Sequence, residues 1–141
     1  MGIERIAHIG IAVRDLDAQV RFYREVLGLE LEGIEEVADQ KVRVAVFRVG
    51  EASIELLTPV APESPIAKFL EKHGEGLHHL AYAVRDLSGM LRELSSKGVD
   101  LIDKTPRLGA GGLQIAFLHP RSTFGVLSEL CEGHGEVPHS A

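Results

Sequence analysis

The chain has 141 residues, of which 45% are hydrophobic and 26% are charged, a composition usual for one folded globular unit. Its net charge of -6 comes from scattered acids and argues against a nucleic-acid partner, which would need clustered Lys and Arg. Apolar runs are too short to span a membrane, and no secretory or transit signal precedes the first strand, so a cytoplasmic protein is expected.

The first part of the chain passes from strand-like to helical sequence and back. Residues 3–13 alternate as a strand and are followed by an apolar stripe at helical spacing. The stripe consists of Leu16, Val20, Tyr23 and Leu27. Asp15 stands where a helix N-cap belongs, and Gly28 where the helix should end. Three further strands are predicted over residues 29–36, 40–49 and 52–59.

The second half of the chain repeats this pattern. The segment from His8 to Leu16, HIGIAVRDL, recurs from His79 to Leu87 as HLAYAVRDL, a spacing of 79 − 8 = 71 residues. The repeated segment again passes from a strand into a helix, with Asp86 at the expected N-cap. The strands predicted after this helix span residues 99–103, 113–119 and 125–132.

The repeat predicts an α+β fold of two tandem βαβββ modules in a single domain. The expected boundaries are about 3–60 for module one, about 62–74 for a connecting helix, about 76–132 for module two and 133–141 for a frayed tail. Ser64 and Pro65 suit the start of the connecting helix. One module alone would expose the edges of a curved sheet. Two modules are therefore expected to pair through a pseudo-two-fold axis, so that curved mixed sheets enclose a pocket.

The repeat also relates two pairs of polar residues inside apolar strands. His8 and His79 lie in the first strand of each module, and Glu55 and Glu129 lie in the last strands, 129 − 55 = 74 residues apart. A buried imidazole or carboxylate is costly unless a partner compensates it. We therefore expect all four to bind one divalent metal ion, for which Co, Zn, Ni and Mn suit these ligand types. The single Cys131 excludes a thiolate cluster.

Strand alternation predicts what surrounds the two histidines. It places Gly10 on the His8 face and Ala81 on the His79 face, so that small residues leave room for a ligand. His78 falls on the opposite face and is expected to be structural, as a lone histidine in a strand usually is. The remaining histidines have no repeat partner and are not expected to bind metal: His73, His119, His134 and His139.

These residues, with three further segments, resemble the vicinal oxygen chelate superfamily and, within it, the methylmalonyl-CoA epimerase family over about residues 5–132. The segments are IELLTP followed by SPIAKFL (54–70), GLHHLA (76–81), and GAGG, FLHP and GVLSEL (109–130). The resemblance implies two βαβββ modules, a homodimer, an acyl-CoA substrate and inversion of methylmalonyl-CoA at C2. The metal would bind the thioester oxygen and the malonyl carboxylate and stabilise an enolate.

By the same resemblance, Glu129 is expected to bind the metal and to move the C2 proton, while Glu55 serves the other face of the substrate. Some family members carry Gln at the position of Glu55 and draw a second base from the preceding strand. Residues 41–48 contain no acid, so this assignment does not carry over. The sequence leaves the second base open.

Further residues are expected to bind the rest of the substrate. Lys104, Arg107 and Arg121 are expected near the pocket mouth, where they could bind the CoA phosphates, with solvated surface cations as the alternative. Gly111 and Gly112 are expected to offer backbone amides to the malonyl carboxylate, with a simple hairpin turn as the alternative.

Three other functions fit the same superfamily. A lactoylglutathione lyase of the glyoxalase I type would match the ligands equally well, although the Leu-His-His and Phe-Leu-His-Pro segments count against it. An antibiotic-binding module would need no site of four polar residues. A ring-cleaving dioxygenase is disfavoured because Glu55 would crowd the iron positions needed for dioxygen and catecholate.

Overall fold

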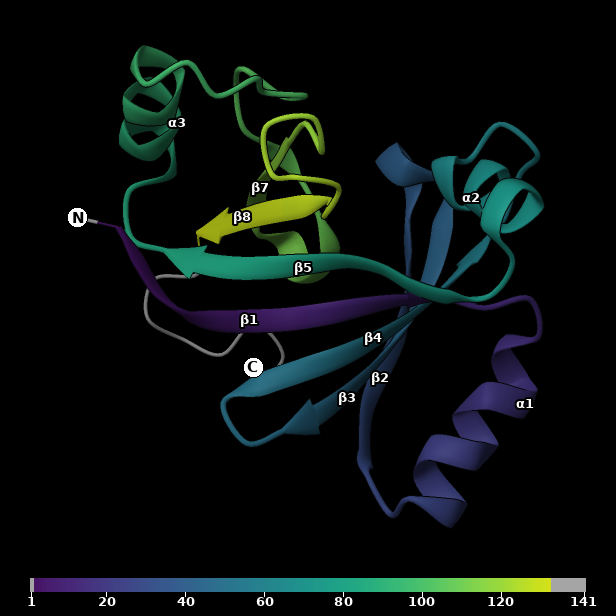
Figure 1. Cartoon of the computed structure of the whole chain (residues 1–141). Helices are drawn as coiled ribbons and strands as arrows, with labels where there is room; N and C mark the ends of the chain where they lie inside the picture. Colours follow the sequence, from purple (N-terminus) through teal and green to yellow (C-terminus); the bar gives the residue numbers. More distant parts are fainter. Residues whose placement is uncertain (1, 133–141) are drawn as a thin grey trace.

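A computed structural model describes residues 2–132, which form one eight-stranded mixed sheet and three α-helices (Figure 1). The strands are β1 (Ile3–Ala12), β2 (Glu30–Val37), β3 (Val42–Val49), β4 (Ala52–Pro59), β5 (Gly76–Val84), β6 (Arg107–Leu108), β7 (Gln114–Leu118) and β8 (Ser128–Glu132). The helices are α1 (Leu16–Arg21), continued by the π-helical segment η1 (Phe22–Val26), α2 (Pro65–His73) and α3 (Leu87–Ser96). Two short 3-10 turns are η2 (Ala38–Gln40) and η3 (Ala110–Gly112).

The strand order, β2-β3-β4-β1-β5-β8-β7-β6, is symmetric about the β1–β5 pair. β1 runs antiparallel to β5, and each has as its parallel neighbour the last strand of its own module, β4 or β8. His8 lies opposite Ala81, and Gly10 lies opposite His79, so one two-fold operation exchanges the two pairs. The α+β fold of two modules with pseudo-two-fold symmetry is confirmed.

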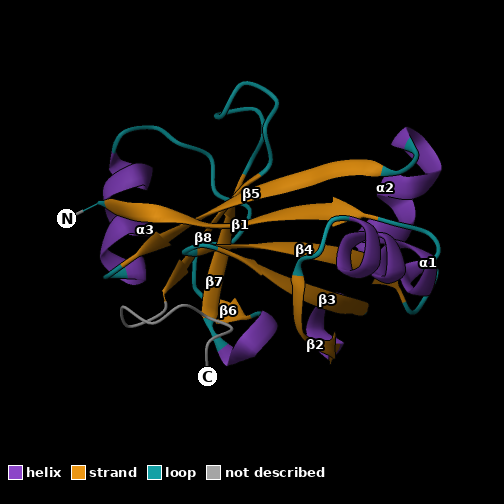
Figure 2. Ribbon diagram, turned by 90° about the horizontal axis from the view of Figure 1, so that it is seen from below, coloured by secondary structure: helices purple, strands orange, loops and turns teal. Residues whose placement is uncertain are grey.

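The helices begin where the sequence predicts. Asp15 accepts a hydrogen bond from the Ala18 amide at 3.1 Å, and Asp86 accepts one from the Gly89 amide at 3.1 Å, so both act as N-caps. Ser64 caps α2 in the same way. Figure 2 shows the strands fanning out, with α1 and α2 toward one end of the β1–β5 pair and α3 toward the other.

The end of the first helix differs from the prediction. The expected stripe continues to Leu27, but the helix becomes π-helical at Phe22, and Leu27 is 52% exposed. A π turn holds more residues than an α turn, so a stripe spaced for 3.6 residues per turn rotates away from the core.

Two strands of module two also differ from the prediction. The strand expected over residues 99–103 is wrong: only an isolated bridge joins Leu101 to Leu118. The Asp103 carboxylate accepts a hydrogen bond from the Phe117 amide at 2.9 Å. This side-chain contact takes the place of one backbone hydrogen bond of a regular strand pair. The last strand was expected from residue 125 but begins at Ser128, because residues 120–126 form turns. The predicted frayed tail lies outside the described residues.

Each module packs its own helix against its own strands. Leu16 of α1 packs in a cluster with Leu56 of β4, and Leu87 of α3 packs in a cluster with Leu130 of β8. Because side chains alternate along a strand, the residues before Leu56 and Leu130, which are Glu55 and Glu129, point to the opposite face of the sheet. Cys131 is a buried free thiol, and burial raises its pKa. Within residues 2–132, no helix has the length and apolar character needed to cross a membrane.

Candidate metal centre

The four residues singled out by the repeat lie on the four central strands of the sheet. Glu55 is on β4, His8 on β1, His79 on β5 and Glu129 on β8, which is also their spatial order. All four side chains are buried, with exposed fractions of 3%, 5%, 8% and 4% in that order. The symmetric pairing of β1 with β5 therefore brings one His and one Glu of each module to the centre of the molecule.

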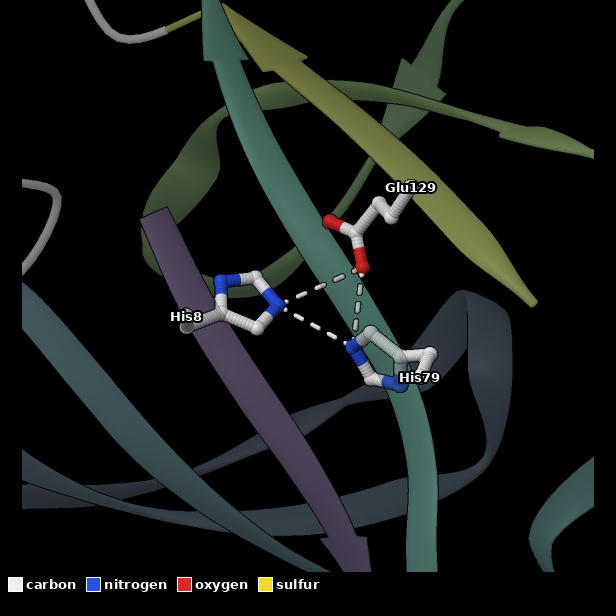
Figure 3. A group of neighbouring side chains, drawn as sticks. All are labelled: His8, His79 and Glu129. Carbon is white, nitrogen blue, oxygen red and sulfur yellow. Dashed lines mark hydrogen bonds and ion pairs between the residues drawn. The ribbon is translucent and has the colours of Figure 1, made fainter. Parts of the chain in front are cut away.

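Three of these side chains point toward one another, as Figure 3 shows. The Nε2 atoms of His8 and His79 are 3.0 Å apart. Glu129 Oε1 lies 3.0 Å from His79 Nε2 and 3.3 Å from His8 Nε2. Two imidazole nitrogens and one carboxylate oxygen thus converge on one buried point, where each residue offers one ligand atom.

Glu55 approaches His8 from the other side of the imidazole ring. Its Oε2 lies 3.3 Å from His8 Nδ1, the nitrogen that faces away from His79. Glu55 nevertheless borders the same cavity of about 20 Å³ as His8, His79 and Glu129. The structure therefore brings all four predicted residues together, with three converging directly and the fourth in contact through His8.

The electrostatics of the cluster are governed by burial and by the two carboxylates. Burial lowers the pKa of His8, but Glu55 and Glu129 outweigh this effect and raise it from 6.5 to about 9. Burial raises the pKa of Glu129, but His8 and His79 outweigh it and hold that pKa well below its usual range. A positive charge is therefore stabilised between the carboxylates, and a cation can supply it.

The donor set fits a divalent metal ion. Neutral imidazole and carboxylate together suit Co, Zn, Ni or Mn, and thiolate is missing from the converging atoms. A cavity of about 20 Å³ is comparable in size to a single water or ion. His8, His79 and Glu129 present the converging atoms, and Glu55 is the other carboxylate at the cavity wall.

Gly10 has a specific steric role beside this cluster. A Cβ atom at this position would lie only 2.2 Å from Cε1 and 2.4 Å from Nδ1 of His79. The sequence predicted that small residues leave room for a ligand. Here the space beside Gly10 is filled by the His79 ring itself, so this glycine admits the imidazole to its place.

His78 is expected to be structural, but its ring contacts His79, one of the candidate metal ligands. The pairing register passes from Gly10–His79 to Ile11–Leu77, so His78 is the extra residue of a β-bulge. Its Nδ1 lies 2.9 Å from Nδ1 of His79. Burial and the neighbouring His79 lower the pKa of His78 to about 3, so its ring is neutral at physiological pH. Simple strand alternation missed this contact because it assumed a regular strand.

The cations predicted to bind phosphate lie in different surroundings. Arg107 forms ion pairs with Asp39 at 3.1 Å and with Asp103 at 3.2 Å, and its guanidinium lies 5.7 Å from the Phe117 ring centre. It borders a cavity of about 160 Å³ that His78 also lines. Arg121 is exposed and pairs with Asp100 at 2.8 Å. Lys104 is exposed in the loop that precedes β6.

The two glycines predicted to bind a carboxylate already hold contacts within the chain. The Gly111 amide donates to Glu35 Oε1 at 3.0 Å, and the Gly112 amide donates to the Gly109 carbonyl at 3.3 Å. The Gly111 partner is a carboxylate, which is the chemical group expected from a malonyl substrate. No pattern in the sequence places Glu35 beside Gly111, because Glu35 belongs to the other module.

A larger cavity opens beside the cluster. It has a volume of about 890 Å³ and lies between α2, the first half of β5 and the loop before β8. His78 and His79 are both part of its wall, with Phe69 of α2 on one side and Val126 on the other. The cluster of His and Glu side chains is therefore adjacent to a space large enough for an extended organic ligand.

Comparison with known proteins identifies the class to which this fold and site belong. The sequence model of the Glyoxalase/Bleomycin resistance protein/Dioxygenase superfamily matches residues 7–117. The uncharacterized protein YqjC of Bacillus subtilis is 48% identical over 134 residues, covering 95% of this chain and 96% of YqjC.

Similar solved structures identify the family within this superfamily. The methylmalonyl-CoA epimerase of Mycobacterium tuberculosis is 42% identical, with a TM-score of 0.89, and the match covers 92% of this chain and 88% of that one. A methylmalonyl-CoA epimerase solved with methylmalonyl-CoA and NH4+ is 38% identical, with a TM-score of 0.91 and coverage of 95% and 97%. The chain belongs to the methylmalonyl-CoA epimerase family.

Proposed function

We propose that this protein is a metal-dependent epimerase that inverts methylmalonyl-CoA at C2. The observation that carries the proposal is the buried convergence of His8, His79 and Glu129 within a chain of this family. A relative 38% identical to this chain has been solved with methylmalonyl-CoA, which supports the choice of acyl-CoA substrate.

One divalent ion, Co, Zn, Ni or Mn, would be held by His8, His79 and Glu129, with Glu55 as the fourth ligand. When bound, such an ion would supply positive charge to offset the negative charge that develops on the thioester oxygen as C2 loses its proton. The buried strands keep all four side chains away from bulk water, where this electrostatic effect would be weaker.

Glu129 and Glu55 are the residues that would move protons. Inversion at C2 needs a base on one face of the substrate and an acid on the other. Glu55 and Glu129 are the carboxylates among the described residues that line the small cavity, and they approach it from β4 and β8, on opposite sides of the β1–β5 pair. This arrangement supports Glu55 as the second acid or base, which the sequence left open.

Residues outside the metal site would bind the charged groups of the substrate. Lys104, Arg107 and Arg121 would bind the CoA phosphates, and the amides of Gly111 and Gly112 would bind the malonyl carboxylate. At Gly111, the substrate carboxylate would have to replace the carboxylate of Glu35, which accepts the hydrogen bond of the Gly111 amide in this structure. A cytoplasmic homodimer completes the proposal.

The decisive test is proton exchange at C2. Protein loaded with each metal in turn is given methylmalonyl-CoA in deuterated water, and both epimerisation and deuterium incorporation are followed by NMR. The native protein should catalyse both epimerisation and deuterium incorporation, and Glu129→Gln should lose both activities. Glu71→Gln, on the exposed face of α2, should keep both activities at the native level. Conversion of a glutathione hemithioacetal without epimerisation would instead establish the glyoxalase I alternative.

A further inference from the structure

The contact between the two neighbouring histidines of β5 carries a further inference about the proposed metal site. The Nδ1 atoms of His78 and His79 are 2.9 Å apart, so one of them must donate a proton and the other must accept it. The other nitrogen of His79, Nε2, faces His8 and Glu129. The direction of the His78–His79 hydrogen bond therefore decides what Nε2 of His79 can do.

We propose that His78 is a positioning residue that accepts a hydrogen bond from Nδ1 of His79 and so presents the Nε2 lone pair of His79 to the metal. A neutral imidazole carries one proton, on either Nδ1 or Nε2. If His79 donates through Nδ1, then its Nε2 is free to bind a cation. If His78 donated instead, the proton of His79 would be on Nε2 and would block that position.

The surroundings of His78 hold its ring in place for this role. The bulge in β5 turns the side chain toward His79, and the ring packs edge-on against Phe69 of α2 with centroids 4.9 Å apart. The His79 ring is fixed in turn by Phe117, 5.6 Å away, and by the space left at Gly10. Both rings are therefore oriented by packing, and little freedom is lost when the hydrogen bond forms.

The other histidine of the site has a different neighbour at its Nδ1. Nδ1 of His8 lies 3.3 Å from Glu55, whereas Nδ1 of His79 lies 2.9 Å from His78. Metal-binding histidines in proteins commonly have the second ring nitrogen held by an acceptor, which fixes the tautomer and the ring orientation. His8 Nδ1 instead faces the carboxylate of Glu55, the proposed fourth ligand, so the two halves of the site differ although their strands are symmetric.

Two variants separate the hydrogen bond from simple packing. His78→Leu keeps an apolar side chain against Phe69 but removes the acceptor. His78→Asn places an amide oxygen at the same distance along the side chain as Nδ1, so it can accept the proton of His79. His73→Leu is the matched control, because His73 also packs on Phe69, with centroids 4.8 Å apart, but is exposed and does not contact His79.

The readouts are cobalt affinity and the protonation of the two rings in zinc-loaded protein, observed by nitrogen-15 NMR. The inference rests on the metal site of the proposed function. In His78→Leu we expect cobalt affinity to fall about 10- to 100-fold, with a changed cobalt absorption spectrum. His78→Asn should stay within a few-fold of the native protein, and His73→Leu should match it. Zinc-loaded native protein should carry the proton of His79 on Nδ1 and leave Nδ1 of His78 bare.

The outcomes distinguish this inference from the proposed function. Native protein that binds neither ion would overturn the metal site and the role of His78 together. Native protein that binds both ions, with His78→Leu unchanged in affinity and spectrum, would overturn the role of His78 alone. A proton found on Nδ1 of His78 in the zinc-loaded protein would do the same.

Discussion

At the scale of single residues, the centre of the molecule holds two carboxylates and two imidazoles where water scarcely reaches. Each charge there is tolerated only because an opposite charge lies within about 4 Å, and removal of one partner leaves the other buried and uncompensated. His8 occupies the middle of this arrangement, with Glu55 at one nitrogen and Glu129 at the other. Its protonation should therefore control the stability of the metal-free protein.

The pH dependence of that stability has a definite sign. The pKa of His8 is raised from 6.5 to about 9 in the fold, so the native state holds this proton more tightly than the unfolded chain does. The resulting stabilisation is complete below pH 6.5 and is lost as pH rises through about 9. Urea unfolding with a chelator present should show this loss between pH 6.5 and 10. His8→Asn should flatten the pH profile, and an equal slope in both proteins would contradict the assignment.

A second prediction concerns the close approach at Gly10. Because a Cβ atom there would lie 2.2 Å from the His79 ring, Gly10→Ala must push the imidazole aside. We expect a loss of stability of roughly 1–3 kcal/mol, as for other overpacked sites. Cobalt affinity, measured by titration calorimetry, should fall at least about tenfold. Gly33→Ala is the control, because no atom lies within 4 Å of its new Cβ.

The difference between what the sequence predicts and what it misses is clear among these residues. The repeat identifies His8, His79, Glu55 and Glu129 as equivalent pairs, and the structure brings them together. The role of His78 cannot be derived in the same way, because a bulge shifts the strand face by one residue and leaves no mark in the apolar alternation. Close approaches such as that at Gly10 depend on strand pairing and are likewise invisible in one strand alone.

At the scale of elements, the turn η3 of module two contacts module one beside the cluster of His and Glu side chains. Ala110 of this turn borders the small cavity, and the neighbouring Gly111 amide binds Glu35 of β2. Arg107 of β6 forms a second link, to Asp39 of η2. Side chains of module one therefore hold a segment of module two beside the candidate metal site.

Loss of the first link should loosen η3. Glu35→Ala removes the acceptor of the Gly111 amide, so that amide should exchange with deuterium faster. Hydrogen exchange followed by NMR measures this rate directly. Glu36→Ala is the control, because the neighbouring Glu36 pairs with exposed Arg43 on the same strand pair and does not reach η3. Equal exchange of Gly111 in native protein and Glu35→Ala would show that the turn is held by other contacts.

Elements with local signals were predictable, and elements that depend on distant partners were not. Asp15, Asp86 and Ser64 start their helices as expected, because a cap acts on amides two or three residues away. The region of residues 99–103 has strand-like composition, yet it forms only one bridge, since Asp103 bonds to Phe117 of a later strand. The π-helical end of the first helix likewise gave no signal in its apolar spacing.

At the scale of the whole molecule, the β1–β5 pair makes two similar modules into one structure. Its antiparallel register joins the modules along most of both strands. Ala7 of β1 lies in a buried cluster with Ala81 and Ala83 of β5, so module one contributes to a core of module two. His8 and Glu129 form an ion pair across the same boundary. These contacts predict that neither module unfolds while the other stays folded.

The two tyrosines allow this prediction to be measured in each module. The chain contains no tryptophan and two tyrosines, Tyr23 and Tyr82. Tyr23 packs against Phe47 in module one, with ring centroids 5.7 Å apart, and Tyr82 packs on the core cluster of module two. Tyr82→Phe leaves a fluorophore in module one alone, and Tyr23→Phe leaves one in module two alone.

Within each variant, tyrosine fluorescence should follow the same urea transition as circular dichroism of the whole chain, because the modules share the β1–β5 pair and unfold as one unit. Comparison of two probes in one protein removes any effect of the substitution itself on stability. Addition of a metal should move both transitions to higher urea by the same amount, since the proposed site takes a His and a Glu from each module. A fluorescence midpoint that departs from the circular dichroism midpoint in either variant would mean that the modules unfold independently.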